Sequence, residues 1–271
     1  MADDITRRAL LAGAGALAAT TVMGVRTAAA ATTPALFIAA HPDDETLAMG
    51  VAIAEHVAAG VPTHLLLLTR GIGSRAQGYI NGVSTSSWWG VRHNPAAEGY
   101  APLSDSEFGQ ARVRETQNAV KCLSSGLGTV TIHEAGLRGF DQAAAADAIL
   151  TVANGINAGG PVSLKGHTWL VDTHSDHLAA GKAIASLAAR EPARFASPRY
   201  YILAPFWSDS RLSQVNERWD YPANAGIRAR AVNACRAHAA WAPPHSYAIG
   251  HHSSSNYFTP VIANPRCLYH A

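Results

Sequence analysis

This 271-residue sequence has few cysteines and few charged residues, and neither sign of charge is in large excess. The three cysteines include no C-x-x-C pair, which argues against a cysteine-based metal site or a disulfide framework, although a single bridge between Cys235 and Cys267 stays open. Charged residues make up 15% of the chain, and the formal net charge is +2. Because nucleic acids and anionic membranes are bound by clustered basic residues, we expect neither as a partner.

A long apolar run is also missing, and this decides how the first 31 residues are interpreted. Arg7 and Arg8 precede an Ala- and Gly-rich stretch, and a run of alanines ends at Ala31. The stretch is too short and too weakly apolar for a membrane span, which needs about 20 apolar residues. Paired arginines before such a stretch indicate a twin-arginine-type signal segment over residues 1–31. We therefore expect export, removal of this segment and no stable membrane anchor.

Hydrophobic residues, in contrast, make up 48% of the chain, enough for the core of a single domain over residues 32–271. Alternating strand-like and helix-like segments predict an α/β, Rossmann-like fold, with a mostly parallel sheet and helices on both faces. Residues 70–104 break the alternation and predict a long loop insertion, a lid capping the carboxyl edge of the sheet. Strands are predicted at 35–40, 63–69, 129–133, 167–172 and 199–203, and helices at 46–59, 107–123, 142–152, 178–190 and 225–240.

Two polar clusters directly follow predicted strands, at the edge where open α/β sheets bind ligands. One is His41-Pro-Asp-Asp-Glu45 and the other is His174-Ser-Asp-His177. Adjacent carboxylates in a poorly solvated cleft repel each other unless a cation compensates, and imidazole with carboxylate is half of a zinc site. Acidic residues alone could merely cap a helix, but the pairing of both clusters favours a metal. Isolated histidines such as His238 are expected to be structural, and His251 and His252 to lie at the surface.

These clusters resemble, in order and spacing, those of the LmbE-like (PIG-L) family of zinc-dependent N-acetylglucosaminyl deacetylases, and Arg112-Val-Arg-Glu115 resembles the family's R-x-x-E. The resemblance extends over residues 36–203. It implies Zn²⁺ as cofactor and hydrolysis of the N-acetyl group of an N-acetylglucosaminyl moiety, with a zinc-bound water attacking the amide. By position it also implies residue roles: zinc ligands His41, Asp44 and His177; general base Asp43; and stabilisation of the oxyanion by His174, assisted by Asp176.

The insertion contains residue types that suit a sugar substrate. Aromatic rings stack on sugars and polar groups bind hydroxyls. The predicted substrate contacts are Arg75, Trp88, Arg92, His93 and Asn94. A small hydrophobic sub-core within the lid explains its aromatic residues as well. Together with the leader, the insertion resembles the deacetylases of teicoplanin-type glycopeptide antibiotic biosynthesis, which implies a glycopeptide pseudoaglycone as the substrate.

Two other functions stay open from the sequence alone. The chain could deacetylate a different N-acetylglucosaminyl glycoside, such as a small thiol precursor or a cell-wall fragment. It could also be a non-catalytic, metal-dependent sugar-binding protein that uses the same cleft. A binding protein has no need of a carboxylate at Asp43, which favours an enzyme.

The export prediction is tested by the N-terminus of the secreted protein. We expect cleavage near Ala30 or Ala31, because small residues follow the apolar stretch there. Mass spectrometry of the secreted chain gives its first residue. A secreted chain that still begins with Met1 would contradict the prediction.

Overall fold

The main sheet of the computed structural model has seven strands in the order β3-β2-β1-β4-β5-β9-β6, and the structure describes residues 32–271. The predicted leader lies outside these residues. Strands β1 to β5 are parallel, and β9 runs antiparallel to β5 and β6. The elements are β1 (Ala35–Ala39), α1 (Asp44–Ala58), β2 (Thr63–Thr69), α2 (Arg75–Ile80), α3 (Asp105–Ser124), β3 (Val130–Leu137), α4 (Gln142–Ile156), β4 (Ser163–His167), α5 (Ser175–Arg190), β5 (Arg199–Ile202), two short 3₁₀ helices (Ala204–Phe206 and Ser210–Gln214), β6 (Arg218–Asp220), α6 (Ala225–Ala237), a hairpin of β7 (Trp241–Ala242) and β8 (Ser246–Tyr247), α7 (Ile249–Ala263) and β9 (Cys267–His270).

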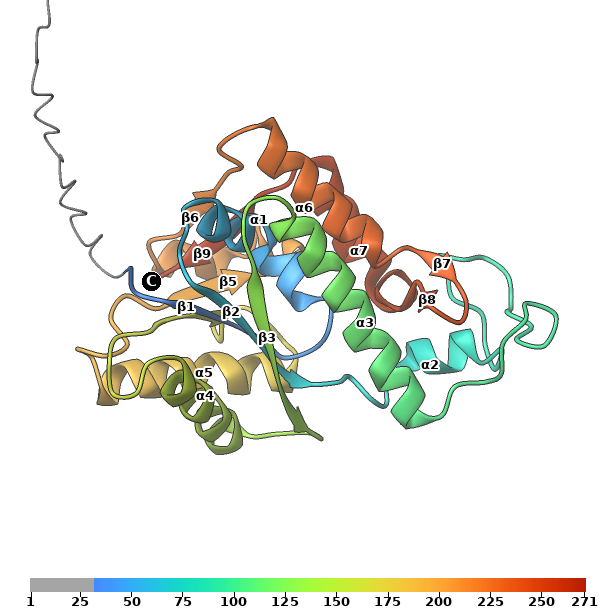
Figure 1. Ribbon diagram of the computed structural model, residues 1–271, viewed down its shortest axis with the longest axis horizontal. Coiled ribbons are helices and arrows are strands. Elements are labelled where there is room, and N and C mark those ends of the chain that lie inside the picture. Colours follow the sequence, from blue (N-terminus) through green and yellow to red (C-terminus); the bar gives the residue numbers. More distant parts are fainter. Residues whose placement is uncertain (1–31) are drawn as a thin grey trace, which may run out of the picture. The chain divides into compact units, whose positions relative to one another are not determined.

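Successive side chains of the central strands point into different cores, as the two-residue period of a strand requires. Leu36 and Ile38 of β1 pack with α4 and α5, whereas Phe37 packs with α1 and α6 on the opposite face. Figure 1 shows α4 and α5 below the sheet, with α1, α3, α6 and α7 above it. Both faces of the inner strands are therefore covered, which explains why β1 and β2 are continuous apolar runs. The predicted α/β, Rossmann-like architecture is confirmed.

The order of the strands reverses at β1, and this point places the site. From β1 the chain passes to β2 and β3 on one side, and then returns to β4 and β5 on the other side. A crevice forms beyond the carboxyl ends of β1 and β4, where ligands bind in sheets of this kind. His41 follows β1, and His174 lies directly before α5, which follows β4.

Several predicted boundaries are wrong. The fourth strand is Ser163–His167, so it ends at the residue where the prediction began it, and residues 168–172 are a loop. The apolar residues of this loop, Leu170 and Val171, misled the prediction because they are buried in a small cluster with Ile202, Leu268 and the segment 204–219 without being part of a strand. The insertion includes one short helix, α2. The antiparallel strands β6 and β9 and the helix α7 have no clear sequence signal, because they are short or polar.

Cys235 and Cys267 are both buried, free thiols in the same core cluster, so the structure has no bridge between them. Cys122 packs against that cluster as an apolar filler. Within residues 32–271, no helix is both long enough and apolar enough to cross a membrane.

Gly181 allows α5 to pack directly on the chain that leaves β4. A Cβ atom at Gly181 would lie 2.6 Å from the carbonyl oxygen of His167 and 3.0 Å from the amide nitrogen of Trp169. We expect Gly181→Ala to lower the free energy of unfolding by about 1–3 kcal/mol, because backbone atoms must move to accept the methyl group. Urea denaturation measures this change.

Gly155→Ala is the matched control. Gly155 lies in α4, and a Cβ atom there would meet no atom within 4 Å. This change should stabilise the protein by about 0.5–1 kcal/mol, because alanine loses less conformational freedom than glycine on folding. Equal effects of the two substitutions would contradict the proposed close approach at Gly181.

Candidate metal centre and active site

A cavity of about 960 Å³ opens at the switch point of the sheet. The loop after β1, the start of α5, residues 69–74 after β2 and residues 136–139 at the end of β3 form its walls. Helix α7 completes it with Ser253, Ser254 and Tyr257. Every residue of the two predicted polar clusters that was assigned a role lines this cavity: His41, Asp43, Asp44, His174, Asp176 and His177.

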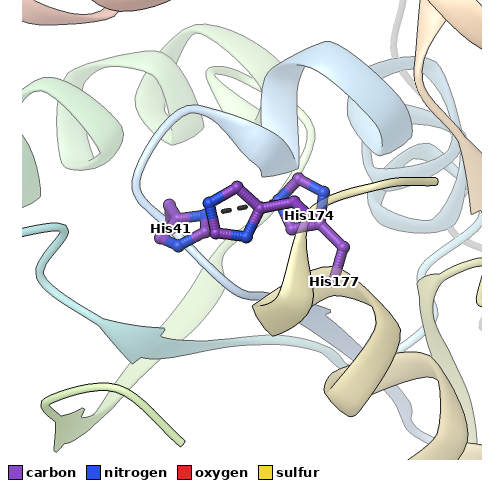
Figure 2. A group of neighbouring side chains, drawn as sticks. All are labelled: His41, His174 and His177. Atoms are coloured by element: carbon purple, nitrogen blue, oxygen red, sulfur yellow. Dashed lines mark hydrogen bonds between the residues drawn. The ribbon is translucent and has the colours of Figure 1, made fainter.

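Three ligand atoms form a nearly equilateral triangle at the bottom of the cavity. His41 Nδ1 lies 3.2 Å from His177 Nε2 and 3.4 Å from Asp44 Oδ2, and these last two atoms are 3.3 Å apart. Around a tetrahedral zinc ion with bonds of roughly 2.0–2.1 Å, neighbouring ligand atoms lie about 3.3 Å apart. The residues present therefore fit zinc with three protein ligands. Figure 2 shows the rings of His41, His174 and His177 gathered at one place, with a dashed line for the hydrogen bond between His41 and His177.

Carboxylates behind the two histidine ligands determine which ring nitrogen faces the triangle. Asp176 Oδ2 lies 3.1 Å from His41 Nε2, and Asp172 Oδ2 lies 2.8 Å from His177 Nδ1. Each neutral ring donates its proton to its carboxylate, so that a lone pair points into the triangle, the arrangement typical of metal-binding histidines. Two lone pairs 3.2 Å apart repel each other unless a proton or a metal cation lies between them.

The same electrostatics act on a proton at this place. Burial alone would lower the pKa of His177, but the carboxylates of Asp44 and Asp172 raise it to about 10. The triangle thus attracts one positive charge at neutral pH. A metal ion with neutral histidines and the Asp44 carboxylate satisfies the same requirement.

Asp43 lies next to the ligands, in a conformation that only strong local contacts maintain. Its φ angle is 120°, a region that costs a residue with a side chain about 1–3 kcal/mol. Its amide donates to Glu45 Oε2 at 2.9 Å, and its carboxylate accepts from Arg112 Nη2 at 3.1 Å. Burial raises the pKa of Asp43 to about 6, although the Arg112 charge opposes the shift. A buried carboxylate with this pKa is suited to general base catalysis.

Arg112 reaches Asp43 across a glycine. Its guanidinium also donates to the carbonyl oxygens of Pro42 at 2.6 Å and of Gly71 at 3.2 Å. A Cβ atom at Gly71 would lie 1.8 Å from Arg112 Nη1, and the φ angle there is +63°. Gly71, in the stretch after β2, is therefore needed for the arginine to pass.

Two further buried carboxylates, Glu45 and Glu115, lie behind the site with His238 between them. His238 Nε2 is 2.9 Å from Glu45 Oε1, and its Nδ1 is 3.8 Å from Glu115 Oε2. Burial would lower the pKa of His238, but Glu115 and Glu45 raise it to about 10. Glu115 also accepts from the amides of Tyr247, Ile249 and Gly250, at 3.0–3.2 Å. His238, expected to be structural, is thus the buried cation that joins α1 and α3.

His174 and Asp176 are arranged differently from the expectation. The resemblance implied that Asp176 assists His174, but its carboxylate contacts His41, and only its amide donates to His174 Nδ1, at 3.2 Å. Burial and the neighbouring His41 and His177 lower the pKa of His174. Its exposed ring lies with its centroid 4.6 Å from that of His41, and His174, His41 and His177 each offer a ring nitrogen within 4.8 Å of the other two, so His174 could also contact a metal.

None of the five predicted substrate contacts in the insertion lines the cavity. Arg75 is exposed at the start of α2, and Arg92 is exposed and donates to the carbonyl of Gly82. The side chain of Asn94 only accepts from the amide of Ala97 in its own turn. These residues lie outside the cavity walls, and their role as substrate contacts stays a prediction.

The aromatic residues of the insertion form a sub-core, the alternative that the sequence left open. His93 is buried and stacks on Trp241, with ring centroids 4.2 Å apart, and Trp88 packs on His251 and His252. Both histidines of α7, expected at the surface, are buried by this contact. The expectation was wrong because a Ser-rich stretch was taken for a loop, whereas it begins a helix that the insertion covers.

Sequence reasoning also missed residues at the site. Asp172 precedes the second cluster by only two positions, a spacing that could have indicated its role. His167 ends β4 and lies 3.2 Å from Asp44 Oδ2, but it was read as the start of a strand. Tyr257 and its two serine neighbours on α7 gave no signal, because their approach depends on tertiary packing.

The sheet, the ligand triangle and the adjacent buried carboxylate define a Rossmann-like protein with a candidate metal centre at its switch point. The family model for PIG-L, described as GlcNAc-PI de-N-acetylase, matches residues 36–188, more than half of the chain. The chain therefore belongs to the PIG-L family of de-N-acetylases, as the resemblance implied. Curated protein sequences give no significant match.

Solved structures share the fold. A triple mutant of the deacetylase Orf2* from teicoplanin biosynthesis has a TM-score of 0.56 at 15% identity, covering 88% of this chain and 97% of that one. The A40926 pseudoaglycone deacetylase Dbv21 has a TM-score of 0.56 at 17% identity, and the match covers 88% of this chain and 96% of that one. GalB, a 4-carboxy-2-hydroxymuconate hydratase from Pseudomonas putida, has a TM-score of 0.52 at 18% identity, and the match covers 85% of this chain and 84% of that one. Because the fold is common to deacetylases and a hydratase, the reaction must be argued from the site.

Replacing Asp172, whose carboxylate contacts His177 Nδ1, tests whether His177 Nε2 is free to bind a metal. In Asp172→Asn, Oδ1 must still accept from the amides of Thr173 and His174, which leaves the NH₂ group facing His177 Nδ1. The His177 proton then moves to Nε2, and we expect zinc affinity to fall about 10–100-fold. Competition with a chromophoric chelator measures it. The exposed Asp147→Asn should have the affinity of the parent protein, and unchanged affinity in Asp172→Asn would contradict the tautomer assignment.

Proposed function

We propose that the protein is a zinc-dependent hydrolase that removes the acetyl group from an N-acetylglucosaminyl moiety. The observation that carries the proposal is the ligand triangle of His41, Asp44 and His177, with the buried Asp43 beside it at the same cavity. A binding protein has no need of a strained, buried carboxylate next to its metal ligands. Membership of the PIG-L family supports the same reaction.

Zinc, when bound by the triangle, would make a water molecule acidic and polarise the amide carbonyl. Asp43 takes the proton from that water as a new bond forms to the carbonyl carbon. When the carbon–nitrogen bond breaks, the same carboxyl group gives its proton to the departing amine. The products are acetate and the free amino sugar.

Arg112 and His174 assist in different ways. Arg112 holds Asp43 in a conformation that the backbone disfavours, so the base does not turn away between cycles. His174 lies beside the triangle and lines the cavity, where a ring N–H can donate to the oxyanion. Such a donor, when held in place, contributes about 2.7–4 kcal/mol to transition-state stabilisation.

A glycopeptide pseudoaglycone is the proposed substrate. The support is the shared fold of this chain with the teicoplanin deacetylase and Dbv21, and the size of the cavity. The sugar would lie between residues 70–74 and α7, whose hydroxyl groups of Ser253, Ser254 and Tyr257 line the cavity. Another N-acetylglucosaminyl glycoside fits the same chemistry. We also propose that the enzyme acts outside the cytoplasm, on the evidence of the twin arginines at residues 7 and 8.

The base assignment is tested by Asp43→Asn. We expect this change to retain zinc and to lower kcat by about 10²–10⁴-fold, because an amide cannot accept the proton. His177→Ala should lose both zinc and activity. Acetate release from a panel of N-acetylglucosaminides, including glycopeptide pseudoaglycones, is measured together with zinc content. Full activity of Asp43→Asn would refute the role of this residue, and no acetate from any N-acetylated sugar would refute the proposed reaction.

A further inference from the structure

Helix α7 is broken where it meets the cavity. Ser254 has a φ angle of −147° and a ψ angle of 37°, so α7 consists of a first turn and a second segment that continues to Ala263. Ser253 and Ser254, here called the serine turn, line the cavity at this break, and Tyr257 lines it from the next turn. The position of the first turn therefore decides where the two serine hydroxyl groups lie.

The first turn of α7 is fixed at two places. At its start, Glu115 accepts from the amides of Ile249 and Gly250, at 3.0 and 3.2 Å. Near its end, His252 is 4% exposed, and its ring forms hydrogen bonds to residues of the insertion. His252 directly precedes the serine turn, so its ring ties to the insertion the part of the turn that is next to the cavity.

A chain of hydrogen bonds joins His252 to the insertion. The amide of Trp89 donates to Ser86 Oγ at 3.1 Å, and Ser86 Oγ lies 2.8 Å from His252 Nδ1. His252 Nε2 lies 3.3 Å from His93 Nε2, and His93 Nδ1 lies 2.8 Å from Glu98 Oε2. When Ser86 donates to His252, His252 donates to His93, and His93 donates to the carboxylate. One tautomer of each neutral ring thus pairs every polar atom of the chain.

The insertion offers a fixed partner to α7. His93 is 4% exposed and stacks on Trp241 of β7, with ring centroids 4.2 Å apart, where the insertion passes beside β7 (Figure 1). A Cβ atom at Gly82 would lie 2.5 Å from the carbonyl oxygen of His93, so two turns of the insertion are in direct contact. Because His93 is held on both sides, its hydrogen bond restricts the movement of His252.

We propose that the insertion acts on the substrate through α7: His93 and His252 are positioning residues that hold the serine turn where its hydroxyl groups bind the sugar. Neither histidine lines the cavity, so neither touches the reacting atoms. The proposal rests on the proposed function, because it takes the cavity to be the substrate site. Loss of a contact that supports substrate and transition state equally raises KM and leaves kcat unchanged.

Substitutions at His252 separate its hydrogen bonds from its ring. His252→Phe keeps an aromatic ring but removes both hydrogen bonds, whereas His252→Gln keeps an N–H donor for His93. On the N-acetylglucosaminide from which the parent releases acetate fastest, we expect His252→Phe to raise KM about 5–50-fold with kcat within about threefold of the parent. His252→Gln should keep KM within about threefold of the parent value.

Ser86→Ala is a second variant, which keeps both rings and serves if His252→Phe does not fold. It removes the hydroxyl group that donates to His252 Nδ1. Because one hydrogen bond is lost instead of two, we expect KM to rise about 2–10-fold.

Hydrogen–deuterium exchange measures the anchoring of α7 without any substrate. Peptides over residues 249–258 should exchange faster in His252→Phe than in the parent, because the turn has lost its tie to the insertion. Peptides over residues 175–190 of α5, on the other side of the cavity, should exchange at the parent rate. Faster exchange in both segments would indicate a general loss of stability and would contradict the positioning role.

His251→Phe is the matched control. His251 is the neighbouring buried histidine and stacks on Phe258 with centroids 4.3 Å apart, but within residues 32–271 its Nδ1 has no hydrogen-bond partner. Phenylalanine keeps the stacked ring and leaves the hydrogen-bond chain intact. KM and the exchange of residues 249–258 should therefore stay at the parent values.

The outcomes separate this inference from the proposed function. An unchanged KM in His252→Phe or Ser86→Ala, an equal rise of KM in His252→Gln, or a loss confined to kcat would overturn the positioning role, while acetate release by the parent still supports the function. A parent protein that releases no acetate from any N-acetylated sugar would overturn the function and the effect on KM together. The exchange comparison would then still decide whether the insertion holds α7.

Discussion

Two imidazole lone pairs that face each other across 3.2 Å are the constraint on which this site depends. In the neutral rings the protons lie on the far sides, where Asp176 and Asp172 accept them, so that a further proton or a metal ion is needed between His41 and His177. The carboxylates therefore act before any metal arrives. They make the space between the two rings favourable for a positive charge. The surrounding protein holds the triangle in this geometry, and this requires several charged groups to be buried together.

The base is supported in a different way from the ligands. Asp43 has a backbone conformation that would relax without its neighbours, and three contacts oppose this relaxation: Glu45 on its amide, and Arg112 on both its side chain and the preceding carbonyl. Arg112 is itself close to Gly71, which has no side chain to obstruct it. A strained residue that several independent contacts hold is pre-organised, so little reorganisation remains for the reaction itself.

Much of this arrangement is predictable from the sequence, because it follows from local patterns. The strand–helix–strand alternation and the polar clusters at strand ends indicate both the fold and the edge where the site lies, and the family comparison agrees with them. His167 and Asp172 were missed because their positions at the site depend on where β4 ends and on the path of the loop that follows it. The packing of Trp88 and His93 could not be predicted, because aromatic residues suit a sugar and a small core equally, and only the structure shows the core that they form.

Glu115 connects this site to the order in which the chain is synthesised. Its carboxylate is fully enclosed, but three of the amides that satisfy it belong to residues 247–250, and the compensating cation is His238. The segment that matches the family model ends at residue 188. When a ribosome has made only that segment, both carboxylates lack the His238 cation and Glu115 lacks these three amides, and enclosing the two charges would be very costly. The parallel half of the sheet must then wait for the C-terminal helices before its catalytic edge can close, so that an incomplete chain does not present a finished active site.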